Sequence, residues 1–291
     1  MPANPTPPTP VDPLYVQARR VLLDALTTLA PHGVSVIVAG AQAIYLHTGE
    51  AEIAVAPYTS DGDLALDPSK LADSPTLEAA MLAAHFTLSA EPGIWLAAAN
   101  LAGEAITIPV DLIVPEGAAT GAGRRDARLP GHGRRVARRV LGLEAALVDH
   151  APIAITALDP EDKRSVTAEV AGPTALLIAK LHKLHERIQG NRPHRLDDKD
   201  AADIVRIMQT TNPDEIADTW GTLAHHQIAG EPSLAALDHL DALYGRRGRR
   251  GIEMATRALR TGIPESRLQA LCVGYTTALL ARTAGLQRRP S

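Results

Sequence analysis

Short apolar runs alternate with amphipathic segments along the first half of the chain. Helical spacing of apolar residues covers residues 16–29, 41–49 and 70–85. Strand-like runs cover residues 34–40, 59–66, 94–98, 105–114 and 151–159. In the run 105–114, Ile106, Ile108 and Val110 alternate with Thr107 and Pro109, which predicts a strand with one buried face. This half of the chain therefore predicts a mixed sheet with helices.

The second half of the chain has a different pattern. From about residue 172 helical spacing continues almost to the end, with breaks at Asn-Pro and Gly-Pro positions. The first 13 residues hold six prolines and few apolar residues, which predicts a disordered arm. We therefore expect an α+β protein with an arm at 1–13, a mixed-sheet domain at 14–160 and an all-helical domain at 161–291. The two domains are expected to join near residues 158–172.

Composition narrows the classes of protein that fit. Aromatic residues make up only 3% of the 291 residues, so Ala, Leu, Ile and Val must form the core. Cys272 is the single cysteine, which excludes an internal disulfide and a cysteine zinc cluster and is typical of a reducing cytoplasm. No apolar run reaches the roughly 18 residues of a membrane span, and no basic-then-apolar leader is present. We therefore expect a cytoplasmic protein without a membrane partner.

Two aspartates, one residue apart, lie in the strand-like run 59–66. Because side chains alternate along a strand, Asp61 and Asp63 project from the same face, about 6–7 Å apart. A cation between them relieves their repulsion, and Mg²⁺ prefers one or two protein carboxylates together with phosphate oxygens. Asp111, in a neighbouring predicted strand, is a third candidate ligand. The alternative, that both acids lie in a solvated strand end, stays open from the spacing alone.

A small-residue turn and a helix start precede the aspartates, and backbone N–H groups at a helix start bind phosphate. The order of Gly40–Ala41, Asp61-Gly62-Asp63 and Asp111 resembles the polymerase-β-type nucleotidyltransferase fold. The segments "AKLHKLHER" (179–187) and "DKDAADI" (198–204) resemble segments of the AbiEii/AbiGii toxin family, which includes the MenT-type toxins of bacterial toxin–antitoxin systems. This resemblance covers roughly residues 34–208 and depends on the order and spacing of several short motifs.

The resemblance implies a metal-dependent nucleotidyltransferase with its catalytic domain at 14–160. Such an enzyme transfers a nucleoside monophosphate from an NTP to an acceptor hydroxyl and releases pyrophosphate. The implied catalytic residues are Asp61, Asp63, Asp111, Lys180 and Asp200, with Mg²⁺ or Mn²⁺ bound by the first three. The implied nucleotide-binding residues are Gly40, Ala41, Thr59, Lys180 and Arg187. Ala41 stands where the family usually has Gly or Ser, and the usual basic residue before the acidic strand is missing, which leaves the preferred NTP open.

The predicted helix that contains "AKLHKLHER" (179–187) has two stripes. Its apolar stripe consists of Leu177, Leu181, Leu184 and Ile188. Beside this stripe lie Lys180, Lys183 and Arg187, which are either an ordinary solvated face or a phosphate-binding face. From the resemblance we expect Lys180 to act on phosphate, Asp200 to orient Lys180, and Lys183 to be solvated.

The segment 123–139 is rich in glycine and holds seven arginines and one acid. For toxins of this family the acceptor is thought to be RNA, with tRNA 3′ ends the leading case, and the protein partner is an antitoxin. Arg134, Arg135, Arg138 and Arg139 are therefore candidate RNA contacts, because a protein with a net charge of −4 needs a local basic patch to hold RNA. A solvated loop or an oligomer contact explains these arginines equally well. Two other functions stay open, a nucleotidyltransferase acting on a small molecule and a non-catalytic relative that binds nucleotide or RNA.

Overall fold

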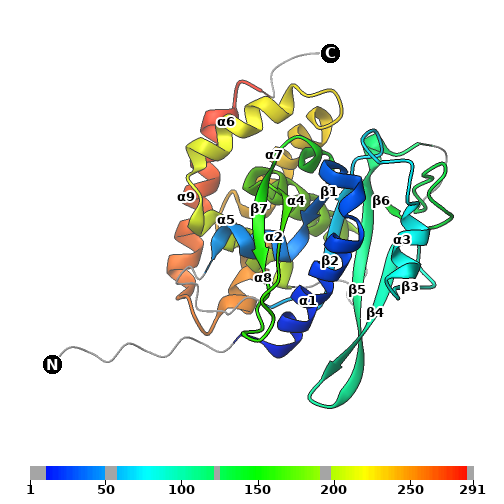
Figure 1. The fold of residues 1–291 in the computed structure, drawn as a ribbon. Helices are drawn as coiled ribbons and strands as arrows, with labels where there is room; N and C mark the ends of the chain where they lie inside the picture. Colours follow the sequence, from blue (N-terminus) through cyan, green and yellow to red (C-terminus); the bar gives the residue numbers. More distant parts are fainter. Residues whose placement is uncertain (1–10, 50–57, 121–124, 191–197, 287–291) are drawn as a thin grey trace.

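The computed structural model describes residues 11–49, 58–120, 125–190 and 198–286. Most of the arm expected at 1–13, and Arg124 of the arginine-rich segment, lie outside the described residues. The described chain forms a mixed sheet with helices, followed by a helical region (Figure 1). The expected α+β class is therefore confirmed.

The sheet has eight strands in the described part of the chain. They are β1 Val36–Ala39, β2 Gly62–Leu66, β3 Thr87–Leu88, β4 Ile94–Leu101, β5 Glu104–Pro115, β6 Arg138–Val140, β7 His150–Thr156 and β8 Ser165–Ala171. The strand order is β3-β4-β5-β2-β1-β8-β7, and β6 pairs with β5 off this path. The pairs β2–β5, β1–β8 and β5–β6 are parallel, and the remaining pairs are antiparallel. At the centre of the sheet, β2 therefore lies between β1 and β5.

Helices flank the sheet and form the second half of the chain. The helices are α1 Pro13–Thr28, α2 Gly40–Thr48, α3 Leu77–Ala83, α4 Pro173–Gln189, α5 Asp198–Thr210, α6 Pro213–Ala224, α7 Gly230–Tyr244, α8 Arg250–Leu259 and α9 Glu265–Thr283. Three short 3₁₀ helices are η1 Ala30–Ser35, η2 Glu116–Ala118 and η3 Glu144–Leu147. In the part of the chain that the structure describes, no helix is long and apolar enough to cross a membrane.

Local sequence signals explain where several helices begin. Asp12 caps α1, because its Oδ1 accepts hydrogen bonds from the N–H groups of Leu14 and Tyr15 at 2.8 and 3.3 Å. Thr76 caps α3 and Asn212 caps α6 in the same way. The helix expected at 70–85 is therefore shorter than predicted, because its cap is Thr76 and the residues before Thr76 form turns.

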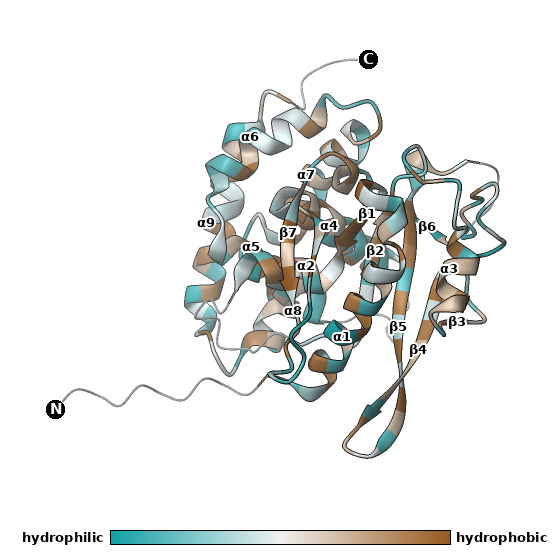
Figure 2. Ribbon diagram, viewed as in Figure 1, coloured by the Kyte–Doolittle hydropathy of each residue, from teal (hydrophilic) through white to brown (hydrophobic). Residues whose placement is uncertain are grey.

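The periodicity of the sequence correctly predicts which residues form the core. In β5, Ile108, Val110 and Leu112 are buried while Asp111 on the opposite face is partly exposed. In α4, Leu177, Leu181 and Leu184 are fully buried. Figure 2 shows hydrophobic positions on the central strands and many hydrophilic positions on the outer helices α6 and α9. The core thus lies between the sheet and the helices that cover it.

The segment expected to join two domains contains a strand. β8 covers Ser165–Ala171 and lies between β1 and β7 in the sheet, so the sheet continues past the boundary predicted at 160/161. Ser165, Thr167 and Glu169 alternate here with Val166, Ala168 and Val170, which is a strand pattern within the segment expected to be helical. α4 begins two residues after β8 ends, and α2 contacts both α4 and α5. The helical region is consequently packed against the start of the sheet, which brings residues of α4 and α5 close to α2.

Candidate active site

The three aspartates that the sequence singled out come together at the centre of the sheet. Asp61 directly precedes β2 and Asp63 lies within it. β2 runs parallel to β5, and Asp63 is the register partner of Asp111. Register partners on adjacent strands point to the same face, so the carboxylates of Asp63 and Asp111 are neighbours. A cluster of acids therefore forms where β2 and β5 lie side by side.

A glycine allows the start of α2 to approach this cluster. Gly40 has φ +64°, and a Cβ atom at this position would lie 1.9 Å from Oδ2 of Asp63. Only glycine therefore fits, both because of the left-handed backbone and because of the adjacent carboxylate. No side chain caps the N-terminus of α2, and Ala41 in its first turn is buried. Backbone N–H groups of this first turn are thus the groups that this end of the helix offers to a ligand.

Thr59 acts on the acid cluster through Asp61. The Thr59 side chain is fully buried, and its Oγ1 donates a hydrogen bond of 2.5 Å to Oδ1 of Asp61. We expected Thr59 to contact nucleotide, whereas in the structure its hydroxyl donates to Asp61. Thr59 therefore fixes the direction of the Asp61 carboxylate.

Repulsion and burial change the protonation of the cluster. Burial raises the pKa of Asp63 to about 6, and the negative charges of Asp61 and Asp111 add to the rise. The positive charges of Lys183 and Arg138 oppose it. Burial also raises the pKa of Asp111, although Arg138 beside it counteracts the effect. The cluster without a bound cation is consequently strained electrostatically, and a positive ligand relieves that strain.

Arg138 belongs to the acid cluster and not to an exposed basic patch. It lies on β6, and its Nη2 and Nε donate hydrogen bonds of 2.5 and 3.1 Å to Oδ2 of Asp111. Arg139, next to it, forms an ion pair of 2.8 Å with Glu116. Of the four arginines expected to form one basic patch, Arg138 and Arg139 are therefore paired with acids, and only Arg134 and Arg135 are left. The sequence could not show this, because β6 is only three residues long and its pairing with β5 is a tertiary feature.

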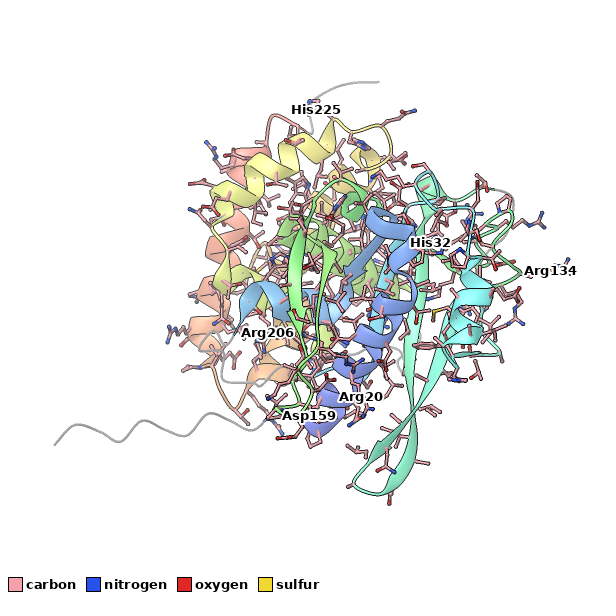
Figure 3. All side chains as sticks on the ribbon, in the orientation of Figure 1. Arg20, His32, Arg134, Asp159, Arg206 and His225 are labelled. Atoms are coloured by element: carbon pink, nitrogen blue, oxygen red, sulfur yellow. The ribbon has the colours of Figure 1, made fainter. Side chains whose placement is uncertain are left out.

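The two remaining arginines of the expected patch are exposed. Arg134 projects outward at the edge of the molecule near α3 (Figure 3). Arg135 is also exposed, and its Nη2 donates a hydrogen bond to the carbonyl oxygen of Ala90. These two side chains are accessible to a polyanion, but they do not lie in the acid cluster.

Lys180 is enclosed by carboxylates of the neighbouring helix. Its Nζ lies 2.7 Å from Oδ1 of Asp200 and 2.7 Å from Oδ2 of Asp203, and its side chain is only 7% exposed. Burial opposes the charge of Lys180, but both aspartates outweigh it and hold the pKa of Lys180 above its ordinary value. The Tyr45 hydroxyl donates to Oδ1 of Asp203 at 3.4 Å, and the guanidinium of Arg206 lies over the Tyr45 ring, 5.0 Å from its centroid. Lys180 is thus part of a buried network that joins α2, α4 and α5.

Lys183, which we expected to be solvated, is partly exposed and forms an ion pair. Its side chain is 45% exposed, and its Nζ lies 3.1 Å from Oδ1 of Asp200. Lys183 is also one of the two cations whose charge reaches both Asp63 and Asp111. Arg187 forms an ion pair of 2.6 Å with Asp200. Asp200 therefore binds all three basic residues of the α4 stripe, and Lys183 is the most exposed of the three.

Some residues of the site were missed by sequence reasoning. Asp203 follows Asp200 by one helical turn in the "DKDAADI" segment, so its position in the motif was a usable signal. Gln42 donates a hydrogen bond to the carbonyl oxygen of Asp61, and Arg138 donates to Asp111. No sequence motif indicated either contact, because both depend on how the elements pack in the tertiary fold. The residues that the structure adds are thus mainly partners that orient the predicted acids.

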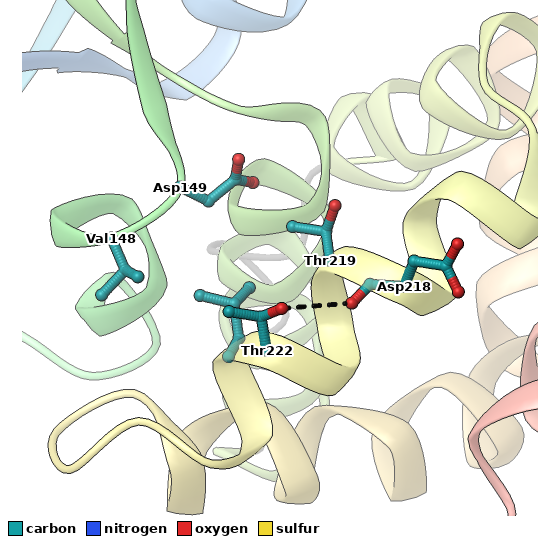
Figure 4. Close-up of a pocket in the computed structure, with 6 residues that line it drawn as sticks. Val148, Asp149, Asp218, Thr219 and Thr222 are labelled. Carbon is teal, nitrogen blue, oxygen red and sulfur yellow. Dashed lines mark hydrogen bonds between the residues drawn. The ribbon is translucent and has the colours of Figure 1, made fainter.

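The structure has a separate cavity that does not include these residues. It has a volume of about 330 Å³ and is lined by Val148, Asp149, Asp218, Thr219, Thr222 and Leu223 (Figure 4). The hydroxyls of Thr219 and Thr222 donate to carbonyl oxygens one turn earlier in α6. Asp149 accepts a hydrogen bond of 2.9 Å from the N–H of Ala175 at the start of α4. The polar groups of this cavity are therefore engaged within the fold.

The acid cluster fits a divalent cation through two of its three carboxylates. Within residues 11–49, 58–120, 125–190 and 198–286, no group of three or more His, Cys, Asp or Glu side chains has the arrangement of a metal site. Arg138 engages Oδ2 of Asp111, which leaves Asp61 and Asp63 as the pair of candidate ligands. Mg²⁺ at phosphate-transfer sites is held by one or two carboxylates together with phosphate oxygens and water. The donor set is therefore suited to Mg²⁺ or Mn²⁺ with a phosphate ligand.

Comparisons with known proteins leave the function to be argued from this geometry. No protein-family model matches the sequence. No curated protein matches it significantly.

Proposed function

We propose that this protein is a metal-dependent nucleotidyltransferase that transfers a nucleoside monophosphate from an NTP to an acceptor hydroxyl and releases pyrophosphate. The observation that supports the proposal is the pairing of Asp63 with Asp111 on parallel strands, with Asp61 beside them and the Gly40 turn against Asp63. A partly buried acid cluster next to a helix N-terminus binds a cation and phosphate groups together. This combination indicates a phosphate-binding and metal-binding site more specifically than two acids in a solvated strand end would.

The residues of the site have separate roles in this reaction. Asp61 and Asp63 would hold Mg²⁺ or Mn²⁺, and Thr59 directs the Asp61 carboxylate. When bound, the metal would supply neutralisation of the charge on the phosphate oxygens of the NTP. The backbone of Gly40 and Ala41 at the start of α2 receives phosphate. Lys183, with its accessible ammonium group, stabilises the negative charge that develops on the phosphates.

Asp111 is the residue that receives the proton of the acceptor. The acceptor oxygen forms a bond to the α-phosphorus of the NTP while the bond from that phosphorus to the leaving pyrophosphate breaks. The hydroxyl proton passes to the carboxylate of Asp111, which burial makes more basic than an ordinary aspartate. Lys180 and Asp200 act together, since their buried ion pair holds α4 and α5 in place and Asp200 in turn orients Lys183.

RNA is the proposed acceptor, with tRNA 3′ ends the first to test, and the proposed biological role is that of a toxin with an antitoxin partner. Arg134 and Arg135 are the exposed arginines available to an RNA backbone. A second candidate is a small-molecule acceptor. The observation that favours it is the commitment of Arg138 and Arg139 to Asp111 and Glu116, which reduces the expected basic patch.

A transfer assay tests the function and separates the two acceptors. Each of the four NTPs, labelled at the α-phosphate, is incubated with the protein, Mg²⁺ or Mn²⁺, and either total RNA or aminoglycosides. We expect label to enter RNA with wild type and with the exposed control Asp73→Asn, but not with Asp63→Asn. Label entering only aminoglycosides selects the small-molecule acceptor. Label in neither acceptor with any NTP, or equal transfer by Asp63→Asn, refutes the proposal.

A further inference from the structure

Gln42 connects the first turn of α2 to the backbone of Asp61. It lies two residues after Gly40 and is 1% exposed. Its Nε2 donates hydrogen bonds to the carbonyl oxygens of Asp61 and Ala18, at 2.9 and 3.2 Å. One buried amide therefore joins the helix start, α1 and the residue that begins the acid cluster.

Arg19 determines which way the Gln42 amide is turned. The Nε of Arg19 lies 2.8 Å from the Gln42 amide, and a guanidinium group can only donate hydrogen bonds. The amide atom that faces Arg19 is therefore Oε1, so Nε2 must face the carbonyl oxygen of Asp61. With the opposite orientation, two donors would meet at Arg19 and two acceptors would meet at Asp61.

Arg19 is an unusual residue to find in this position. It is only 3% exposed, and among the described residues no carboxylate forms an ion pair with it. Its other hydrogen bonds go to the hydroxyl of Tyr15, at 2.8 Å, and to the carbonyl oxygen of Thr156, at 3.1 Å. A buried cation held only by neutral acceptors is costly, because no ion pair offsets its desolvation. Its presence is explained if it orients Gln42.

We propose that Gln42 is a positioning residue that fixes Asp61 relative to the phosphate-binding turn at Gly40, and that Arg19 holds the Gln42 amide in the required orientation. This inference rests on the proposed function of the acid cluster. Thr59 directs the side chain of Asp61 and Gln42 holds its main chain, so the residue is held at both ends. The distance between the helix start and the cluster determines whether metal and phosphate are bound together.

The substitution Gln42→Glu separates positioning from stability. A carboxylate here still accepts a hydrogen bond from Arg19 and forms an ion pair with it, so the melting temperature should stay equal or rise. The oxygen that faces Asp61 can no longer donate, and two acceptors then repel each other. We expect kcat for nucleotide transfer to fall about 10²-fold, the scale of a misplacement of about 1 Å, with a smaller change in KM for NTP. The amide resonances of Asp61 and Gly62 should shift.

Two further variants keep the test decisive. Tyr15→Phe removes a hydrogen bond from Arg19 but none from Gln42, so it should lower the melting temperature while kcat stays within about twofold of wild type. Arg19→Lys keeps the charge but loses the Nε donor, so the amide is free to turn and kcat should fall about tenfold. Arg19→Lys decides the matter if Gln42→Glu does not fold.

The outcomes distinguish this inference from the proposed function. Wild-type kcat and unshifted Asp61 resonances in Gln42→Glu, or wild-type kcat in Arg19→Lys, overturn the positioning role. A loss of activity in Tyr15→Phe equal to that in Gln42→Glu also overturns it, because general loosening of the core then explains both. Shifted Asp61 resonances in a protein whose wild type transfers no nucleotide support the positioning role and overturn the function.

Discussion

Replacing Asp63 by Asn should stabilise the protein at neutral pH in the absence of metal. Burial, together with Asp61 and Asp111, raises the pKa of Asp63 from 3.8 to about 6 in the folded state. A raised pKa means that the protonated form favours folding, so its stabilising contribution is complete below pH 3.8 and is lost as the pH rises through 6. A shift of about 2 units corresponds to about 3 kcal/mol, at 1.36 kcal/mol per unit. Asn has the shape of the protonated acid and carries no charge at any pH.

Urea unfolding at several pH values, with EDTA present, measures this effect. At pH 8 the free energy of unfolding of Asp63→Asn should exceed that of wild type by about 2–3 kcal/mol more than it does at pH 4. Asp73→Asn, at an exposed position, controls for the exchange of a carboxylate for an amide. A difference between Asp63→Asn and wild type that does not change with pH refutes the reasoning. So does a variant that is less stable than wild type at pH 8.

Three other predictions follow from the same site. Mg²⁺ in the millimolar range should raise the melting temperature of wild type but not that of Asp63→Asn, because only the ionised pair binds the cation; equal shifts in both proteins would place the metal elsewhere. Gly40→Ala should lower the free energy of unfolding in urea by at least about 2 kcal/mol more than Gly49→Ala does. Gly40 begins α2 and Gly49 follows its last residue, and both have positive φ, but only a Cβ at Gly40 meets Asp63; equal losses would show that the contact with Asp63 is unimportant. Lys183→Ala should lower kcat by about 10²-fold with little change in stability, whereas Lys180→Ala should cost about 3–5 kcal/mol because Asp200 and Asp203 each lose a buried ion pair; the reverse result would return the catalytic role to Lys180.

Much of the fold could be predicted from local patterns. The alternation in β5 and the apolar stripe of α4 each correspond to a buried face in the structure. Three strands of the described chain were not predicted: β3 and β6, which are only two and three residues long, and β8. In β8, Ser165, Thr167 and Glu169 alternate with Val166, Ala168 and Val170, a strand pattern that lies beyond the expected boundary at 160/161. The segment Ser165–Ala171, expected in the all-helical domain, therefore belongs to the sheet.

The candidate site was likewise only partly predictable from the sequence. The spacing of Asp61 and Asp63 and the helical interval from Lys180 to Lys183 are readable from the sequence, because they depend only on the repeat of a strand or a helix. Which of the two lysines is buried is not readable in this manner. Lys180 and Lys183 differ because Asp203 on α5 forms an ion pair with Lys180 and buries it. The packing of α4 on α5 cannot be predicted from the spacing of residues within one helix.

The sequence by itself determined which residue types were available and which of them share a face of one element. It therefore specified the acids, the glycine turn and the basic stripe. The tertiary structure decided the partners: Arg138 beside Asp111 through the pairing of β6 with β5, and Gln42 between Arg19 and Asp61 through the packing of α1 on the sheet. The physical reason is that a charge or a hydrogen-bonding group acquires its role from what surrounds it. Burial and neighbouring charges come from segments far apart in the chain, and only folding brings those segments together.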